Sequence, residues 1–233
     1  MPNTNKNWID SLPTNRMIAE YSVWSANLTH LGDELARIAP HADVLHVDVA
    51  DGHFAPALLF FPDLVIALRK LSSIPIHIHL MCADSVLLSQ IEQFTEAGCD
   101  LISIHVENES VAGDALDLID AKGVAAGMVL KVETPVSKAA PHLKRLRFLT
   151  LLGTAIGVKG QGLNESAGQR LQEAKALIQK TKAPKRIVLA ADGGIREHTV
   201  PILRGAGTET VVLGSLAFNA PDLAARMAWL HAL

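Results

Sequence analysis

The sequence predicts a single α/β domain folded as a (β/α)8 TIM barrel, and three observations lead to this prediction. The chain has 233 residues, a length that such a barrel fills comfortably. Short, nearly all-apolar runs alternate with segments of helical period, as strands covered on both faces alternate with their connecting helices. No linker rich in Pro, Gly or Ser and no low-complexity tract divides the chain. We therefore expect a barrel domain over 17–233, preceded by an N-terminal extension over 1–16 that Trp8, Ile9 and Leu12 could anchor.

The predicted strands are short runs in which nearly every residue is apolar and many are β-branched. They cover residues 18–25, 44–48, 76–80, 101–106, 125–130, 148–153, 186–191 and 210–214. Apolar residues spaced by three and four predict helices over 64–71, 86–97, 113–121, 168–180 and 200–206. Asp84 or Ser85 can cap the second of these helices, and Gly98 can end it. A doubly wound open sheet is the alternative, but the Gly-rich turn expected after its first strand is missing.

Composition excludes several classes of function. The formal net charge is −3 and aromatic residues make up 4%, whereas nucleic-acid-binding domains are basic and often offer aromatic stacking platforms. Cys82 and Cys99 are too few for a disulfide framework and are expected to be reduced. Residues 1–16 are polar, and no run approaches the roughly 18 apolar residues of a membrane span. We therefore expect a cytoplasmic protein that binds neither nucleic acid nor membranes.

Three predicted strands end in potential metal ligands. His46 and Asp48 are two positions apart on one strand and so point the same way, while His79 and Asp192 end two others. Strand ends of a barrel meet at one mouth, and imidazole and carboxylate together suit Zn, Mn or Fe(II). Taken singly, each residue could be an isolated polar group at a strand end; at equivalent positions in a barrel they predict a site for one divalent metal ion.

Two further histidines lie on the predicted strands beside these candidate ligands. His77 shares the face of His79 but lies one layer deeper, so we interpret it as a satisfied interior residue or a support for a ligand. His105, which ends the fourth strand, could fill either role.

Glycines after the last three strands predict a phosphate site. Gly193 and Gly194 follow the seventh strand, and Gly214 and Ser215 follow the eighth, where barrel enzymes often bind phosphate. The sixth strand leads into a glycine-rich loop over 153–162, long enough to fold over a ligand as a lid. The alternative is that these are ordinary turn glycines with positive φ.

In its combination of motifs the chain resembles the ribulose-phosphate 3-epimerase family over nearly all of residues 18–220. The resemblance rests on the order and spacing of several blocks: Ser-Val-Trp-Ser-Ala-Asn-Leu at 22–28, His-Val-Asp-Val-Ala-Asp-Gly-His-Phe at 46–54, His-Leu-Met at 79–81, Thr-Pro-Val at 134–136, Gly-Val-Lys-Gly-Gln at 157–161, Asp-Gly-Gly-Ile at 192–195 and Gly-Ser at 214–215. It implies a barrel that interconverts C3 epimers of a phosphorylated ketose, by default D-ribulose 5-phosphate and D-xylulose 5-phosphate. It also implies that the protein binds a small sugar phosphate and forms a homo-oligomer.

The resemblance also implies roles for individual residues. One divalent metal ion would be held by His46, Asp48, His79 and Asp192, and Asp48 and Asp192 would also carry the two protons. Ser22 would contact the substrate near the reacting carbons, next to His79 and an apolar cap that includes Met81. The phosphate would be held by the lid and the glycine turns: Gly157, Val158, Lys159, Gly160, Gly193, Gly194, Gly214 and Ser215.

Several positions depart from the family pattern. Ala50 and Leu152 stand where the family usually has Met, so Met81 is left as the single thioether of the apolar cap and the pocket is expected to change in size or shape. Lys131 and Lys159 are new near the mouth, where they could pair with phosphate or an acid group, or be merely solvated. We therefore also consider another ketose phosphate, such as a tetrulose or hexulose phosphate.

Two other classes of function are alternatives. Related decarboxylase-like barrels need an Asp-x-Lys-x-x-Asp array on the second or third strand, and the second strand here has no Lys between Asp48 and Asp51. A non-catalytic sugar-phosphate-binding barrel is disfavoured because loss of an acid or a His is the usual sign of lost catalysis, and the expected set is complete.

Overall fold

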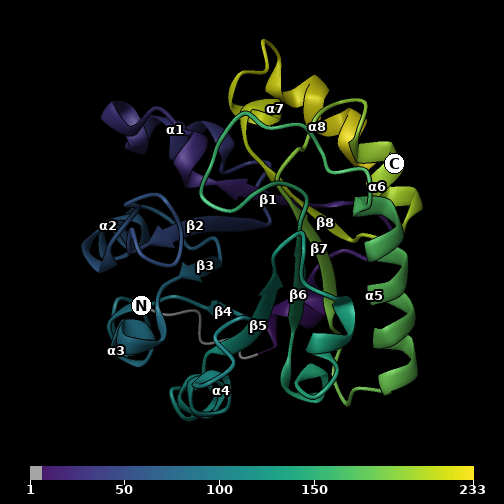
Figure 1. The fold of residues 1–233 in the computed structure, drawn as a ribbon. Coiled ribbons are helices and arrows are strands. Elements are labelled where there is room, and N and C mark those ends of the chain that lie inside the picture. The colour runs from purple at the N-terminus through teal and green to yellow at the C-terminus, as the bar shows by residue number, and fades with distance from the viewer. Residues whose placement is uncertain (1–6) are drawn as a thin grey trace.

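The computed structural model describes residues 7–233 and confirms the predicted fold class: eight parallel strands close into a barrel in chain order. Figure 1 shows the strands at the centre with helices outside them. The strands are β1 (Ile18–Ser22), β2 (Val44–Ala50), β3 (Ile76–Met81), β4 (Leu101–His105), β5 (Ala125–Leu130), β6 (Phe148–Leu152), β7 (Val188–Asp192) and β8 (Thr210–Leu213).

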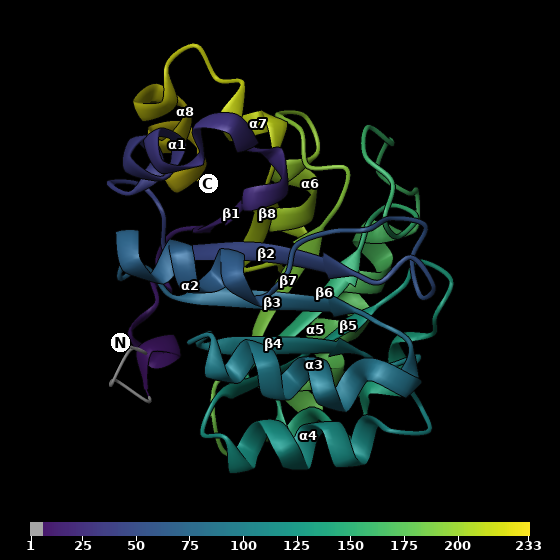
Figure 2. The same ribbon diagram turned by 90° about the vertical axis from the view of Figure 1, so that its left-hand side faces the viewer.

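Helices lie between most consecutive strands and bury their apolar faces against the barrel. They are α1 (Leu31–Ile38), α2 (Pro62–Leu71), α3 (Asp84–Glu96), α4 (Ala112–Ala121), α5 (Ala167–Thr181), α6 (Val200–Gly205), α7 (Ser215–Phe218) and α8 (Leu223–His231). Figure 2 shows α2, α3 and α4 side by side over the strands β2, β3 and β4. Between β5 and β6 the chain instead forms two 3-10 helices, η4 (Val136–Ala139) and η5 (Leu143–Arg145). Within residues 7–233 no helix is long and apolar enough to cross a membrane.

Two strand boundaries differ from the prediction in ways that matter for the site. The first strand was expected to reach residue 25, but its pairing with β2 ends at Ser22, opposite His46, and Val23–Ser25 turns as a 3-10 helix. The seventh strand runs one residue further than expected, so Asp192 is its last residue and pairs with Leu152 of β6. The mouth therefore begins directly at Ser22 and Asp192.

The opposite end of the barrel is closed by the N-terminal segment. The 3-10 helix η1 (Trp8–Ser11) buries Trp8 and Ile9 against an apolar layer that includes Ile18, Leu101 and Phe148, residues at the N-terminal ends of their strands. Figure 2 shows this helix beside the N label, away from the strand arrowheads. The part of the predicted extension over residues 1–6 lies outside the described residues.

Charged contacts fix η1 in place. Arg147, which precedes β6, donates a hydrogen bond of 2.5 Å to Asp10, and Arg186, which precedes β7, donates one of 2.8 Å to the carbonyl of Leu12. Because Arg147 is 6% exposed, its pairing with Asp10 satisfies a nearly buried cation. The segment is therefore a built part of the barrel floor.

Candidate active site

Four side chains meet at the C-terminal ends of β2, β3 and β7. His46 and Asp48 both point inward from β2, and strand register sets His79 of β3 directly opposite Asp48. Nε2 of His46 lies 3.1 Å from Oδ1 of Asp48 and 3.9 Å from Oδ2 of Asp192. Nδ1 of His79 lies 3.2 Å from the same Asp48 oxygen and 3.8 Å from the same Asp192 oxygen. The alternation of strand side chains thus brings together the four residues that the sequence singled out.

This donor set fits a divalent transition-metal ion. One atom from each of the four side chains can be chosen so that all lie within 4.8 Å of one another. Two imidazole nitrogens and two carboxylate oxygens suit Zn, Mn or Fe(II) better than an ion that prefers oxygen alone. Both histidines and Asp48 are buried, and Asp192 is half-buried, so the cluster is nearly dry and open on one side.

The two carboxylates have different surroundings. Burial raises the pKa of Asp48, but the charge and hydrogen bond of His46, together with His79, outweigh burial and hold it well below its usual value. Burial and the neighbouring charge of Asp48 raise the pKa of Asp192 to about 6, although His46 and His79 oppose them. The hydroxyl of Ser22 donates a further hydrogen bond of 3.0 Å to Oδ2 of Asp48. Asp48 is therefore the ionised partner, while Asp192 holds a proton more readily.

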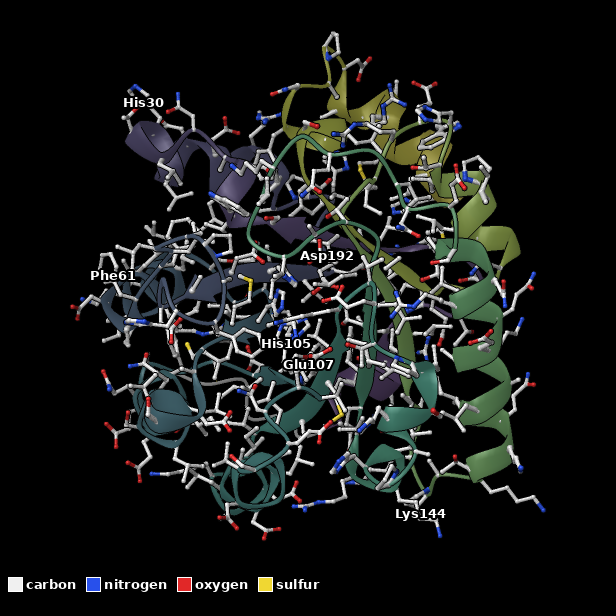
Figure 3. The ribbon with its side chains drawn as sticks, viewed as in Figure 1. His30, Phe61, His105, Glu107, Lys144 and Asp192 are labelled. Carbon is white, nitrogen blue, oxygen red and sulfur yellow. The ribbon has the colours of Figure 1, made fainter. Side chains whose placement is uncertain are left out.

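A second tier of polar side chains supports the cluster. His79 lies 2.8 Å from His105 through the two Nε2 atoms, and Nδ1 of His105 is 3.0 Å from Glu107. On the other side, the buried carboxylate of Glu20 contacts both His46 and His77. Figure 3 shows Asp192, His105 and Glu107 gathered at the centre of the barrel, whereas Phe61 and Lys144 lie at its edge.

Sequence reasoning left His77 and His105 open between two interpretations and did not single out Glu20 or Glu107. His77 lies in the deeper layer and hydrogen-bonds Glu20 and Ser103. The available signal for Glu20 was an acid in the interior of a predicted strand, since a fully buried Glu is rare unless it is paired.

A cavity of about 320 Å³ opens above the four side chains. Asp48, His79 and Asp192 lie at its floor, whereas His46 is not part of its lining. The structure brings every residue expected to contact substrate to its wall: Ser22, His79, Met81, Gly157, Val158, Lys159, Gly160, Gly193, Gly194, Gly214 and Ser215. A site of this size, with polar groups at one end, suits a small polar ligand.

The glycine turn after β7 has a steric requirement. Gly193 and Gly194 have φ of +86° and +71°, a region that side chains other than glycine rarely adopt. A Cβ on Gly194 would lie 2.7 Å from Cα of Leu163, so the β6–α5 loop could not pack where it does. Any other residue at these two positions would therefore strain the backbone, and a side chain at Gly194 would collide with the loop that covers the turn. The backbone of the turn lines the cavity.

Three cationic side chains stand near the mouth, and their positions differ. The ammonium of Lys131 lies 4.0 Å from the ring centre of Phe54 and is not part of the cavity wall. Lys159 and Arg196 do line the cavity, and among residues 7–233 no carboxylate lies within 4.0 Å of either charged group. Burial lowers the pKa of Lys159, although Asp48 opposes that effect. Arg196 was missed in the sequence because it follows the Gly-Gly turn in a loop without a motif of its own.

Ala50 affects the cavity only indirectly. The sequence suggested that its small size would enlarge or reshape the pocket, but Ala50 is not part of the cavity wall. It is 4% exposed and packs with Ala55 and Met81, against the partly buried Ile156 of the lid loop. Leu152, the other position where a Met was expected, does line the cavity. Any change of pocket shape from Ala50 therefore acts through Met81 or Ile156, which both line the cavity.

A closed parallel barrel with a buried His/Asp cluster under a glycine-lined cavity defines a barrel enzyme. Residues 18–218 match the Ribulose-phosphate 3 epimerase family, and the chain belongs to this family. It is 32% identical to the ribulose-phosphate 3-epimerase of Bacillus subtilis (strain 168) over 202 residues, which span 86% of this chain and 92% of that protein. It is 35% identical to ribulose-phosphate 3-epimerase 2 of Cupriavidus necator over 86% of this chain and 84% of the relative. The chain is thus an isomerase of the epimerase class acting on carbohydrates.

Solved structures with low sequence identity share the fold. A 3-keto-L-gulonate-6-phosphate decarboxylase from Vibrio cholerae superposes with a TM-score of 0.67 at 15% identity, covering 92% of this chain and 99% of that one. A 3-hexulose-6-phosphate synthase gives a TM-score of 0.62 at 17% identity, covering 93% and 96%. At such identities the likeness concerns the barrel alone.

Proposed function

We propose that this protein is a metal-dependent 3-epimerase of a phosphorylated ketose, by default interconverting D-ribulose 5-phosphate and D-xylulose 5-phosphate. The observation that carries the proposal is the convergence of Asp48 and Asp192, from the non-adjacent strands β2 and β7, at the floor of one cavity. Inversion at a carbon needs a base on one face and an acid on the other. Two carboxylates approaching from different strands can flank a flat intermediate in this way.

The reaction begins with a weakly acidic proton on C3, the carbon next to the ketone. A divalent ion held by His46, Asp48, His79 and Asp192 would supply Lewis-acid polarisation of the ketone oxygen. In one direction Asp48 removes the proton and Asp192 delivers another from the opposite face; in the reverse direction they exchange these roles. The hydrogen bond from Ser22 holds the Asp48 carboxylate in position. A nearly dry floor keeps the enediolate from competing proton donors.

The phosphate would bind against the glycine turns of the cavity wall. The backbone at Gly193, Gly194 and Gly214 lines the cavity without side chains, which suits hydrogen bonding from N–H groups to phosphate oxygens. Lys159 and Arg196 add positive charge that no carboxylate within 4.0 Å neutralises in the described part of the chain. This charge supports a dianionic ligand, because charge-assisted hydrogen bonds to phosphate are among the strongest in proteins.

A second candidate is the same reaction on another ketose phosphate, such as a tetrulose or hexulose phosphate. The observation in its favour is Leu152, which lines the cavity where the family pattern has Met, together with Lys159 in the lid. A branched side chain in place of a flexible thioether alters the wall next to the sugar carbons. A non-catalytic barrel is disfavoured because all four ligands and both acids are present.

The test is epimerisation of a panel of ketose phosphates by protein loaded separately with Zn, Mn or Fe(II). We expect C3 epimerisation of D-ribulose 5-phosphate, followed by NMR, with turnover lost after chelation and restored by the preferred ion. Faster turnover of a tetrulose or hexulose phosphate would select the second candidate. Failure of every metal-loaded form with every member of the panel would contradict the proposal.

A further inference from the structure

We propose that Glu20 is a positioning residue for the metal site, fixing the ring of His46 so that its Nε2 faces the cation. The inference rests on the proposed metal-dependent function and deepens it. Glu20 is the middle residue of β1 and has no exposed surface. It touches no part of the substrate cavity, so it can act only through its neighbours.

Among residues 7–233, the side chain of Glu20 hydrogen-bonds the two inner histidines alone. Its Oε1 lies 2.7 Å from Nδ1 of His46 and 2.5 Å from Nδ1 of His77. The opposite nitrogen of His46, Nε2, is the one that lies 3.1 Å from Asp48. A carboxylate that takes the outer N–H of a ligating imidazole fixes both the tautomer and the ring orientation. Glu20 therefore accepts the hydrogen bond that orients the ring of His46.

The tautomers follow from the acceptor character of an ionised carboxylate. It has no proton to give, so Nδ1 of both histidines must carry the hydrogens that the short contacts contain. Nε2 of His46 lies 3.1 Å from the ionised Asp48 and so also carries a proton in the metal-free protein, and a cation bound to Nε2 would displace this proton. Nε2 of His77 is a lone pair, and it accepts from the hydroxyl of Ser103 at 2.6 Å. Each ring nitrogen of His46 and His77 is thereby assigned as a hydrogen-bond donor or acceptor.

Glu20, His46 and His77 also lie close enough together to be considered as a second cation site. The distances argue against that interpretation, because contacts of 2.7 and 2.5 Å are shorter than the roughly 3.3 Å that separates two tetrahedral ligands about 2.0–2.1 Å from one cation. A cation there would compete with the N–H protons and would leave His46 bound through the wrong nitrogen for Asp48. The group is better explained as the support of one site than as a second site.

The surrounding layer is built to accommodate this support. Gly127 of β5 leaves room for the Ser103 hydroxyl, since a Cβ at Gly127 would lie 2.1 Å from that oxygen. Thr150, in β6, is also buried, and its hydroxyl has no hydrogen-bond partner among the described residues. The Ser103 hydroxyl thus supports His77, and Thr150, whose hydroxyl bonds none of the described residues, offers a control.

The experiment measures metal binding and histidine tautomers without substrate. In wild-type protein loaded with Zn²⁺, nitrogen NMR should find His46 protonated at Nδ1 and bound to the metal through Nε2. In Glu20→Gln, which keeps the shape and removes the charge, we expect the dissociation constant for Zn²⁺ to rise by about 10- to 100-fold. The control Thr150→Val should stay within about threefold of wild type, because it removes a buried hydroxyl that hydrogen-bonds none of Glu20, His46 and His77.

Three results would overturn the proposal: a Zn²⁺-loaded wild type in which His46 is protonated at Nε2 and not at Nδ1, a Zn²⁺ affinity in folded Glu20→Gln within threefold of wild type, or no Zn²⁺ binding by wild type. The tautomer measurement decides the matter even if the variant does not fold, because it uses the native chain. Failure of the proposed function gives a different pattern, since a protein that epimerises no ketose phosphate can still lose metal affinity in Glu20→Gln.

Discussion

The ammonium of Lys159 lies 4.4 Å from the ring centre of Trp24, and its Nζ donates a hydrogen bond of 2.6 Å to the Trp24 carbonyl. Trp24 lies in the 3-10 helix that follows β1 and Lys159 in the loop that follows β6, and these two segments meet across the mouth of the barrel. Figure 1 shows the long loop between β6 and α5 passing over the strand ends. The pair therefore fastens the glycine-rich loop in a closed position over the cavity, as a lid that excludes water must be.

Replacing Lys159 with Met should loosen this closure while keeping the length of the side chain. A hydrogen bond from a charged donor is worth about 1.5–3 kcal/mol, so we expect KM for the ketose phosphate to rise by roughly tenfold or more. The matched control is Lys144→Met, because Lys144 is exposed and lies far from the mouth in Figure 3. Steady-state kinetics on both variants make the test; equal KM values for the two would refute a role of Lys159 in closure.

Asp48→Asn and Asp192→Asn should each reduce epimerisation by at least about 10²- to 10⁴-fold, the usual contribution of a positioned acid or base. The two variants should differ in the partial reaction that each retains. With one carboxylate left, one epimer can still exchange its C3 proton with solvent, and the two variants should differ in which epimer does so. Because both residues are also candidate ligands, metal content is measured beside kcat. Near-wild-type turnover in either variant would contradict the assignment.

Trp8→Ala should destabilise the barrel without altering its chemistry. Trp8 is 6% exposed and lies 6.4 Å from Phe148, centre to centre, on the apolar floor. Removing such a ring typically costs about 3–5 kcal/mol, which corresponds to a fall in Tm of roughly 6–20 °C in a protein of this size. Calorimetry makes the measurement, and Leu58→Ala, at a side chain 82% exposed, is the control. An unchanged Tm would mean that η1 contributes nothing to the floor.

The two cysteines should be inert in the folded protein. Burial, helped by the charge of Asp51, raises the pKa of Cys82 to about 12, and burial together with Asp100 also raises that of Cys99. Raised values leave almost no thiolate at pH 8, and thiolate is the reactive form. A disulfide-exchange reagent should therefore react slowly with native protein and rapidly with two thiols after denaturation in guanidinium. Rapid reaction of the native protein at pH 8 would contradict the burial of these side chains.

The barrel and the four-residue cluster could be predicted from the sequence because both follow from strand periodicity. His46 and Asp48 alternate on one strand, and equivalent strand ends must meet once the barrel closes. Glu20 could not be found in this way, because its role depends on two histidines from other strands. For Ala50 the sequence suggested too much: its place in the motif predicted a residue of the cavity wall, but the lid loop packs over it. Contacts set by loop packing are the part that periodicity does not determine.

The central claim is proton transfer at C3 by two carboxylates, and solvent-deuterium incorporation tests it most directly. The metal-loaded protein is incubated in D₂O with D-ribulose 5-phosphate and the other ketose phosphates of the panel. The account predicts one solvent deuterium at C3 of every epimerised product molecule, with none at C1 or C4. Epimerised product that keeps its original C3 hydrogen, or exchange with no member of the panel, would contradict it.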